Sequence, residues 1–549
     1  MKNNYFKLFA IVFLFLVFGF SGLNAQIPYT YWNKIYNGSG NVQDSCVSMC
    51  VNSNGDVFVT GWTKGATTAE DIVTIKYNPV TGDTLWVKKM VGPSSDRPLA
   101  ITCDNSSVFV CGWTFNPGRD IITIKYNATT GDTTWIKRYN GSNNGGDYGF
   151  SVAVDNSGNV YTAGRSDVAG GLGQKFTILK YDANGNVPSG WPVVYTGGVS
   201  TSFDEARSVK VDGSGNVYVT GQSGNSPGAD FMTMRINSSG SIQWVKKFNG
   251  SSSLDDVPIG LVLDNTAANL YVGGSCTRPT SVQDYAVIKY SMNGDSLGIA
   301  FYDNNLNSIE VMTAMTIDAS NNVYVTGYSH GGSTNFDYAT LKYNSSLVQQ
   351  WVARTTDAGD DFPVSIVVGD TSSVYVTGTS AGSNGTDFLT IKYRSNGVES
   401  WRKRENGSAN GNDYASAVAF VDVDHVYVTG SMRYNNPPVS TVIYTTRYSN
   451  LVGIEQISTQ LPESYVLAQN YPNPFNPTTT VRFDIPKEAF VKVAVFNVMG
   501  QEVETLVNQD VKAGQYKVTW DASRYASGIY FYKLIANDYV STKKMILIK

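Results

Sequence analysis

The feature that most constrains the fold of this chain is a short apolar segment ending in glycine that recurs eight times. It reads D-V-F-V-T-G at residues 56–61 and N-V-Y-V-T-G at residues 216–221 and 322–327. Variants end at Gly112, Gly164, Gly274, Gly378 and Gly430, so that successive copies lie 51 to 57 residues apart. Eight copies at a period near 50 residues predict a repeat architecture, and this period is typical of a propeller blade.

Each repeat contains four apolar segments separated by turns rich in Gly and Asn. One copy begins with D-Y-G-F-S-V-A-V-D (147–155), and a third segment reads D-I-I-T-I-K-Y (120–126). Segments of this length without helical periodicity predict antiparallel four-stranded sheets, which become stable when they stack face to face around an axis. The fourth segment carries a Trp that suits such an interface. We expect Phe301 to take this place in one repeat; the others carry Trp86, Trp135, Trp191, Trp244, Trp351 and Trp401.

The last repeat ends before its Trp segment, and a Trp segment precedes the first repeat. Residues 413–422, 425–430 and 439–448 supply three segments only, whereas W-N-K-I-Y-N-G-S-G begins at Trp32 and returns as W-I-K-R-Y-N-G-S-N at Trp135. We therefore predict an all-β fold, a β-propeller of eight four-stranded blades in which residues 32–36 complete the last blade. This N-terminal clasp would leave that blade without an unpaired edge.

The repeats resemble the SBBP family of bacterial β-propeller repeats. The resemblance covers about residues 29–450 and rests on S-V-A-V-D-x-S-G-N-V-Y followed by D-x-x-T-I-K-Y. It implies the fold but no particular ligand. The family is usually described as seven-bladed, so seven blades are the alternative to the eight counted here.

The first 25 residues have the features of a secretory signal peptide. Lys2 and Lys7 precede an apolar run at residues 8–20, and Leu23-Asn24-Ala25 is an acceptable cleavage site. The run is too short to span a bilayer comfortably. We therefore predict export, a propeller domain at residues 26–450, and no transmembrane anchor after cleavage.

The C-terminal part of the chain follows a different pattern. Residues 451–463 read as a linker, and residues 464–549 alternate like the strands of a small Ig-like β-sandwich. Their motifs N-Y-P-N-P-F-N-P, G-x-E-V, S-G-I-Y-F-Y and K-K-M-x-L-x-K resemble the C-terminal sorting domain of type IX secretion substrates. The motif residues are Tyr471, Pro472, Asn473, Pro474, Gly500, Gly528, Tyr530, Lys543 and Lys544. The resemblance implies the type IX secretion machinery as a partner and a secreted or outer-membrane surface location in a Gram-negative bacterium.

The net charge and the cysteines give further information about partners and covalent links. A net charge of −4 provides no basic surface for nucleic acid. The five cysteines show no disulfide framework, so we expect small buried side chains, with one local disulfide as the alternative. They are Cys46, Cys50, Cys103, Cys111 and Cys276.

An acidic residue precedes the first segment of most repeats. These residues would form a ring near one mouth of the channel: Asp44, Asp96, Asp147, Asp204, Asp256, Asp360 and Asp413. We expect their carboxylates to accept hydrogen bonds from turn backbone, because a catalytic site usually breaks the symmetry of a repeat. The alternative is a site for a cation or a sugar, and these aspartates are the candidate ligand-binding residues.

No catalytic motif occurs in the chain; its two histidines, His330 and His425, lie outside any cluster, and His425 is predicted to be structural. We expect no cofactor and no metal; calcium at the turns 52–56 and 212–216 is the alternative. The turns T-G-D-T-L-W and T-G-D-T-T-W resemble those of pyrroloquinoline-quinone dehydrogenases, which makes a quinoprotein a minor alternative. The sequence favours a monomeric, non-enzymatic scaffold that binds an extracellular polysaccharide or protein. A hydrolase or lyase of extracellular polymers and a structural surface component are the alternatives.

Overall fold

The computed structural model describes residues 28–548, except residues 39, 41–42, 66–68, 143, 169–172, 198–202, 225–227, 251–253, 280–281, 305–307, 332–334, 356, 370–371, 423–424, 436–438, 450–453, 459 and 523–524. Every regular element in this part of the chain is a β-strand. The predicted signal peptide lies outside the described residues. Across the described ranges, no helix has the length and apolar character needed to cross a membrane.

The repeats form antiparallel sheets whose strands pair in chain order. The first two sheets are β2 (Asp44–Val51), β3 (Val57–Lys64), β4 (Glu70–Tyr77) and β5 (Thr84–Met90), then β6 (Asp96–Cys103), β7 (Ser107–Phe115), β8 (Arg119–Asn127) and β9 (Thr133–Tyr139). The next two repeats are joined into one sheet: β10 (Tyr148–Val154), β11 (Val160–Asp167), β12 (Gln174–Tyr181), β13 (Val193–Tyr195), β14 (Phe203–Val211), β15 (Val217–Gly224), β16 (Ala229–Ile236) and β17 (Ile242–Phe248).

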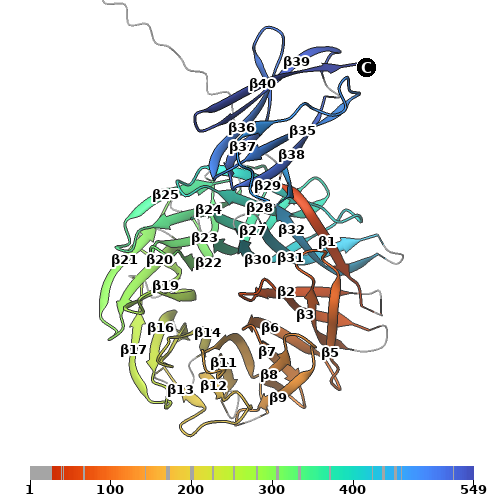
Figure 1. Ribbon diagram of the computed structural model, residues 1–549. Helices are drawn as coiled ribbons and strands as arrows, with labels where there is room; N and C mark the ends of the chain where they lie inside the picture. The colour runs from red at the N-terminus through yellow and green to blue at the C-terminus, as the bar shows by residue number, and fades with distance from the viewer. Residues whose placement is uncertain are drawn as a thin grey trace, which may run out of the picture.

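The later repeats follow the same order. They comprise β18 (Val257–Leu263), β19 (Asn269–Cys276), β20 (Asp284–Ser291) and β21 (Ser296–Tyr302); β22 (Glu310–Ile317), β23 (Val323–His330), β24 (Phe336–Tyr343) and β25 (Gln349–Arg354); β26 (Asp361–Val368), β27 (Val374–Gly382), β28 (Gly385–Tyr393) and β29 (Glu399–Glu405); and β30 (Tyr414–Asp422), β31 (His425–Tyr434) and β32 (Ser440–Ser449). Figure 1 shows the sheets arranged around a common centre, with the first strand of each repeat innermost.

The sheets are stabilised by packing on one another. The second strand of each repeat is almost entirely buried, as in β3, where every residue from Val57 to Thr63 is buried. Both faces of such a strand are covered by neighbouring sheets, so its Val, Ile, Phe and Tyr side chains need not alternate with polar ones. Innermost strands contact the next in turn, and β2 contacts both β6 and β30.

The N-terminal strand β1 (Tyr29–Tyr36) is the fourth strand of the last repeat's sheet. It pairs antiparallel with β32, with Trp32 opposite Arg447 and Tyr36 opposite Ile443, in the sheet order β1-β32-β31-β30. This is the pairing that the repeat pattern predicts for residues 32–36. Figure 1 shows β1 beside β32, although more than 400 residues separate them along the chain.

The repeated Trp joins one sheet to the next. The Trp86 Nε1 atom donates a hydrogen bond to the Ala128 carbonyl in the next repeat, over 3.3 Å, and the Trp32 Nε1 atom donates likewise to Pro79 over 3.1 Å. The turn that receives Trp86 contains Gly131, at φ +73°, and a Cβ there would lie 2.7 Å from the indole ring. Glycine is therefore required at this turn both for its backbone conformation and for the close approach of the ring.

One repeat lacks this Trp, and the prediction that Phe301 replaces it is wrong. Gly298 lies opposite Lys289, the position at which Trp86 lies opposite Lys76 in β5 and β4. Phe301 is three residues further on and 38% exposed. The turn of the following repeat carries the buried Leu347 at φ +61° where other repeats have glycine. The prediction chose Phe301 because it is an aromatic residue of this segment. The strand register instead places Gly298 in the Trp position and Leu347 in the facing turn of the next repeat.

The first two repeats are also linked covalently. Cys50 of β2 and Cys103 of β6 form a disulfide, with their Cα atoms 6.2 Å apart. The interpretation of these two residues as small apolar side chains is therefore wrong, and the alternative of a local disulfide is correct. Cys46, Cys111 and Cys276 are free and buried, as predicted. The register of adjacent innermost strands, which a single sequence does not reveal, brings Cys50 and Cys103 together.

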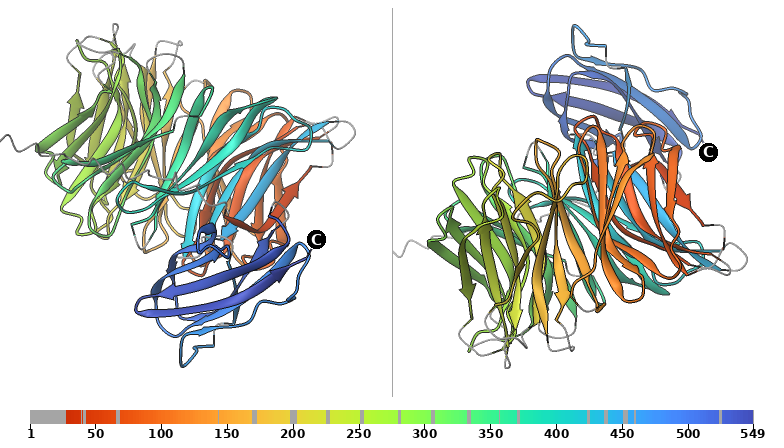
Figure 2. Two further views of the ribbon diagram at one scale, coloured as in Figure 1. Left: turned by 90° about the horizontal axis from the view of Figure 1, so that it is seen from above. Right: turned by 90° about the horizontal axis from the view of Figure 1, so that it is seen from below.

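The C-terminal domain is a sandwich of two four-stranded sheets. One has the order β33-β38-β35-β34 and the other β37-β36-β39-β40. Their bounds are β33 (Ile454–Ser458), β34 (Val466–Leu467), β35 (Thr478–Ile485), β36 (Ala489–Phe496), β37 (Glu502–Val511), β38 (Gly514–Asp521), β39 (Gly528–Ala536) and β40 (Tyr539–Leu547). The two further views of Figure 2 show this domain beside the ring of repeats.

Part of the predicted linker belongs to this sandwich. Residues 454–458 form β33, which pairs with β38, and Ile454 is buried in the core that contains Trp520 and Tyr532. The C-terminal sheet thus begins earlier than its conspicuous Pro-rich motif. The linker prediction is wrong at residues 454–458, because a short edge strand leaves little apolar pattern in the sequence.

Candidate functional site

Most of the predicted ring acids are buried hydrogen-bond acceptors for loop backbone. The Asp413 Oδ2 atom accepts from the Gly407 backbone N–H and its Oδ1 atom from the Arg433 N–H, both over 2.6 Å. Asp147 binds Gly141 and Asp167 in the same way. Burial raises the pKa of both carboxyl groups, and the backbone hydrogen bonds act in the opposite direction. Asp44, Asp96, Asp204 and Asp256 are equally buried at the corresponding place.

Two repeats differ from the predicted ring. Asp361, and not Asp360, occupies the equivalent place: Asp361 is buried opposite Ser380 at the start of β26, while Asp360 is exposed. The adjacent aspartates made the register ambiguous in the sequence. The other difference is Glu310, which lies opposite Ser329 at the start of β22 and is also fully buried. The sequence pattern does not predict this residue, because Glu stands here where the other repeats carry Asp.

Glu310 lies in a cluster of three carboxylates that the other repeats do not form among the described residues. Asp284 starts β20, Asp303 follows β21, and one carboxylate oxygen of each lies within 4.8 Å of the others and of Glu310. The Arg278 Nε atom contacts Asp284 over 2.8 Å. Burial raises the pKa of Glu310 to about 7, with smaller contributions from the charges of Asp284 and Asp303.

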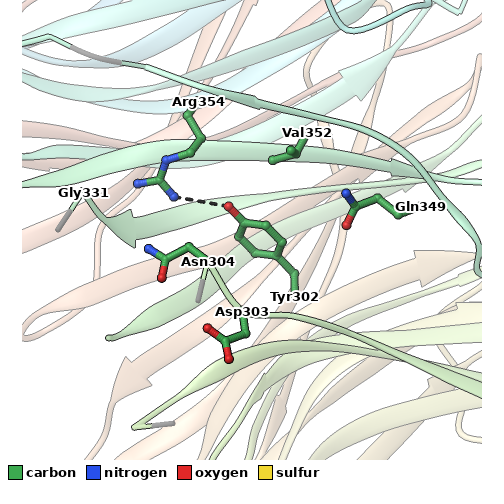
Figure 3. A pocket seen from close by; sticks show the side chains of 7 residues that line it. All are labelled: Tyr302, Asp303, Asn304, Gly331, Gln349, Val352 and Arg354. Carbon is green, nitrogen blue, oxygen red and sulfur yellow. Dashed lines mark hydrogen bonds between the residues drawn. The ribbon is translucent and has the colours of Figure 1, made fainter. Parts of the chain in front are cut away.

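A pocket of about 480 Å³ opens next to this cluster, and Asp303 belongs to both. The lining residues come from the end of β21, the loop after β23 and strand β25: Tyr302, Asp303, Asn304, Gly331, Gln349, Val352 and Arg354. Figure 3 shows Tyr302, Gln349 and Arg354 around the same space, with Asn304 and Asp303 on the opposite side. The lining therefore offers an aromatic ring together with acidic, basic and amide groups.

Hydrogen bonds fix the polar side chains of the pocket. The Arg354 guanidinium donates to the Tyr302 hydroxyl over 3.2 Å, to the Ser329 Oγ atom over 2.5 Å and to the Asp337 carboxylate over 3.2 Å. The Asn304 amide donates to the His330 carbonyl over 2.6 Å. Ser329 in turn donates to the Glu310 Oε1 atom over 3.2 Å. The pocket and the carboxylate cluster are thus one connected network.

The remaining candidates in the sequence have local roles. The rings of His330 and His425 pack edge-on against Phe336 and Tyr31. At the turn 212–216, the Asp212 carboxylate accepts hydrogen bonds from the Ser214 and Asn216 backbone within the same turn. This is the hydrogen bonding that Asp commonly makes within a turn.

The sorting-motif residues occupy several places in the C-terminal sandwich. Residues 471–474 contain no strand; Tyr471 is 82% exposed, and the Asn473 Oδ1 atom accepts from the Ile546 backbone N–H. Gly500 occupies a turn at φ +76°. Tyr530 of β39, which begins at Gly528, packs on Trp520, and its hydroxyl donates to the Ala526 carbonyl. Lys543 and Lys544 lie on β40, beside β39.

Comparison with known protein families identifies two parts of the chain. Residues 469–549 match the family described as the secretion system C-terminal sorting domain, and residues 134–171 match the beta-propeller repeat. The chain therefore carries β-propeller repeats followed by a C-terminal sorting domain of type IX secretion. This domain directs export to the cell surface or the medium of a Gram-negative bacterium. No match is found among curated proteins.

Several solved structures resemble this fold at low identity. The quinohemoprotein alcohol dehydrogenase of Comamonas testosteroni is 12% identical with a TM-score of 0.49, over 81% of this chain and 79% of that chain. PorZ, a surface component of the type IX secretion system of Porphyromonas gingivalis, is 12% identical with a TM-score of 0.39, over 91% and 70%. An ulvan lyase of polysaccharide lyase family 25 is 12% identical with a TM-score of 0.40, over 60% and 88%. At these values the similarities carry no argument about activity.

Proposed function

We propose that this protein is an exported β-propeller scaffold that binds an extracellular polysaccharide or protein at the pocket beside Arg354. The observation that carries the proposal is the coincidence of this pocket with the break in the repeat pattern at Gly298 and Glu310. An aromatic ring with several oriented polar groups in a concave site is the arrangement by which proteins commonly hold small polar ligands. Sugar rings, with one apolar face and several hydroxyls, match this lining.

We further propose that the repeats form a closed propeller of eight four-stranded blades. The pairing of β1 with β32 and the contact of β2 with β30 support this closure. A closed ring would hold the loops that form the pocket rigidly, which limits the entropy lost when a ligand binds.

The test is binding of the full mature chain to an array of extracellular glycans and matrix proteins, followed by Gln349→Ala and Tyr302→Phe. Gln349 lines the pocket, so we expect its truncation to weaken binding about 5- to 30-fold, which corresponds to about 1–2 kcal/mol. Gln350→Ala is the matched control, because the Gln350 amide bonds the Val348 carbonyl in its own turn. Equal binding by the Gln349→Ala and Gln350→Ala variants would place the ligand elsewhere.

An enzyme that cleaves extracellular polymers is the second candidate, and the observation that favours it is the group of three carboxylates, Asp284, Asp303 and Glu310, next to the pocket. A general acid must reach the bond that it protonates. Glu310 is fully buried, so this role would require the site to open. Product release from candidate polysaccharides that is lost in Glu310→Gln would support this function over simple binding.

We propose the type IX secretion machinery as the partner of the C-terminal sandwich. Removal of residues 469–549 is expected to leave the repeat domain in the periplasm, since this segment carries the sorting domain. Cell fractionation and immunodetection measure the distribution. Continued appearance of the truncated protein at the surface or in the medium would contradict the proposal.

A further inference from the structure

The site of Glu310 differs from that of Asp413 in its hydrogen bonding. At Asp413 both carboxylate oxygens accept a backbone N–H, and one of the donors is Gly407, six residues earlier. At Glu310 the residue six positions earlier is Asn304, whose side chain is directed to Ser329 and His330. Glu310 thus takes the place of an Asp, and Asn304 takes the place of the glycine whose backbone N–H bonds the carboxylate at Asp413.

The consequence is a buried carboxylate oxygen without a partner among the described residues. The Glu310 Oε1 atom accepts from the Ser308 and Ser329 hydroxyls, over 2.8 and 3.2 Å. The Oε2 atom is buried and has no hydrogen-bond partner. Burying a carboxylate oxygen without a hydrogen-bond partner costs free energy. A bound cation beside the oxygen is one way in which a native fold offsets this cost.

We propose that Asp284, Asp303 and Glu310 bind a calcium ion at the junction between the β18–β21 and β22–β25 repeats. Two oxygens that bind one Ca²⁺ ion at its usual distances lie at most about 4.6–5.2 Å apart, and the three carboxylates satisfy this limit, with one oxygen of each within 4.8 Å of the others. The three elements that supply them come from both sides of the junction. The ion would therefore join two repeats where the Trp contact is missing.

The charges and the ligand atoms indicate the class of cation. Four carboxylates, those of the cluster and Asp337, face two guanidinium groups, Arg278 and Arg354, which contact Asp284 and Asp337. All the ligand atoms are oxygens, which suits Ca²⁺ or Mg²⁺ better than transition metals. Ca²⁺ tolerates an irregular ligand geometry, whereas Mg²⁺ demands a near-octahedral one. Asp303 also lines the pocket, through which water could complete the coordination.

The experiment measures the Tm of the full mature chain after removal of metal with EDTA, with and without CaCl₂ or MgCl₂, together with calcium titration calorimetry. We expect CaCl₂ at about 100 times Kd to raise the Tm by about 2–5 °C. Asp303→Asn and Glu310→Gln should each remove the shift, and the exposed Asp360→Asn should retain it. These readouts involve no glycan, so they do not depend on the proposed binding function.

Two results would overturn the proposal. A folded wild-type chain that shows neither a Tm shift nor heat with Ca²⁺ would mean that the cluster holds no calcium. A shift that persists in both Asp303→Asn and Glu310→Gln would place the ion elsewhere. If either variant fails to fold, the other still decides the outcome, because Asp303 is partly exposed and Glu310 is buried.

Discussion

Two kinds of junction between sheets occur in the repeat domain. At five junctions in the described part of the chain, which we call regular, a Trp of one repeat packs on the turn glycine of the next, as Trp86 does on Gly131. At the junction that follows β21, Gly298 stands in the Trp position and Leu347 in the glycine position. The Trp–glycine junction recurs along the chain, whereas the Gly298–Leu347 junction lies where the carboxylate cluster and the pocket are found.

The difference shows which features of the repeat support the fold and which are available for chemistry. Most of the repeated groups are engaged in hydrogen bonds and packing, as the carboxylates of Asp147 and Asp413 are with loop backbone. Where the repeat changes, polar groups are released from these contacts and meet in one place. Departures from the repeat are therefore better guides to the candidate site than the repeated acids are.

Removal of β1 should have the largest effect on the regular junctions. Deleting residues 26–40 leaves β32 paired with β31 alone and removes Trp32, which is buried and contacts Tyr77 and Tyr427. Truncating one buried Trp costs about 3–5 kcal/mol, so the deletion should cost more than this. Denaturant unfolding of the deleted chain beside Trp86→Ala, an internal Trp of the same kind, measures both. A deleted chain as stable as the wild type would mean that β1 does not close the domain.

Loss of the disulfide should have the next largest effect. Reduction, or the double substitution Cys50→Ser with Cys103→Ser, should lower stability by about 2–4 kcal/mol, since the bond closes a long loop between two repeats. Unfolding with and without dithiothreitol provides the measurement. The double variant is its own control, because dithiothreitol should leave it unchanged. A wild-type chain insensitive to reduction would contradict the pairing.

The pairing of β1 could be predicted from the sequence, whereas the disulfide could not. Repeat spacing alone predicted the four-stranded sheets and the pairing of residues 32–36, because strand order follows directly from a repeated pattern. It did not predict the disulfide, which depends on the register between innermost strands. Asp303 and Arg354 were also missed, since neither belongs to a motif. The available signal was the loss of Trp and the change from Asp to Glu in neighbouring repeats.

The ring acids allow a smaller and more direct test of the comparison. Asp413→Asn replaces one of two buried acceptors with an NH₂ group that faces a backbone N–H, and should cost about 1–3 kcal/mol. Asp360→Asn, at an exposed position, should cost less than about 0.5 kcal/mol. Without metal, Glu310→Gln should cost less than Asp413→Asn, because one of its oxygens has no partner to lose. Equal losses at Asp413 and Glu310 would remove the distinction between the two sites.

The smallest expected effect is a coupling between Gly298 and Leu347. Lys289, which lies opposite Gly298, donates a hydrogen bond from its ammonium group to the Ser345 carbonyl over 2.9 Å. Ser345 belongs to the same turn as Leu347. Leu347 therefore occupies the side of the junction where Trp would pack. Leu347→Gly relieves a positive φ that costs a leucine about 1–2 kcal/mol but leaves a cavity, for a net loss of about 1–3 kcal/mol.

Restoring both residues of a regular junction tests whether the two positions act together. Gly298→Trp alone should clash with Leu347, whereas Gly298→Trp with Leu347→Gly recreates the pair formed by Trp351 and Gly397. We expect the double variant to be more stable than the sum of the single changes by about 0.5–2 kcal/mol in a double-mutant cycle of unfolding free energies. Gly298→Trp with the distant Val80→Ala, at an exposed turn, is the control and should be additive. Additivity at Gly298 and Leu347 as well would mean that the leucine does not fill the place of the missing Trp.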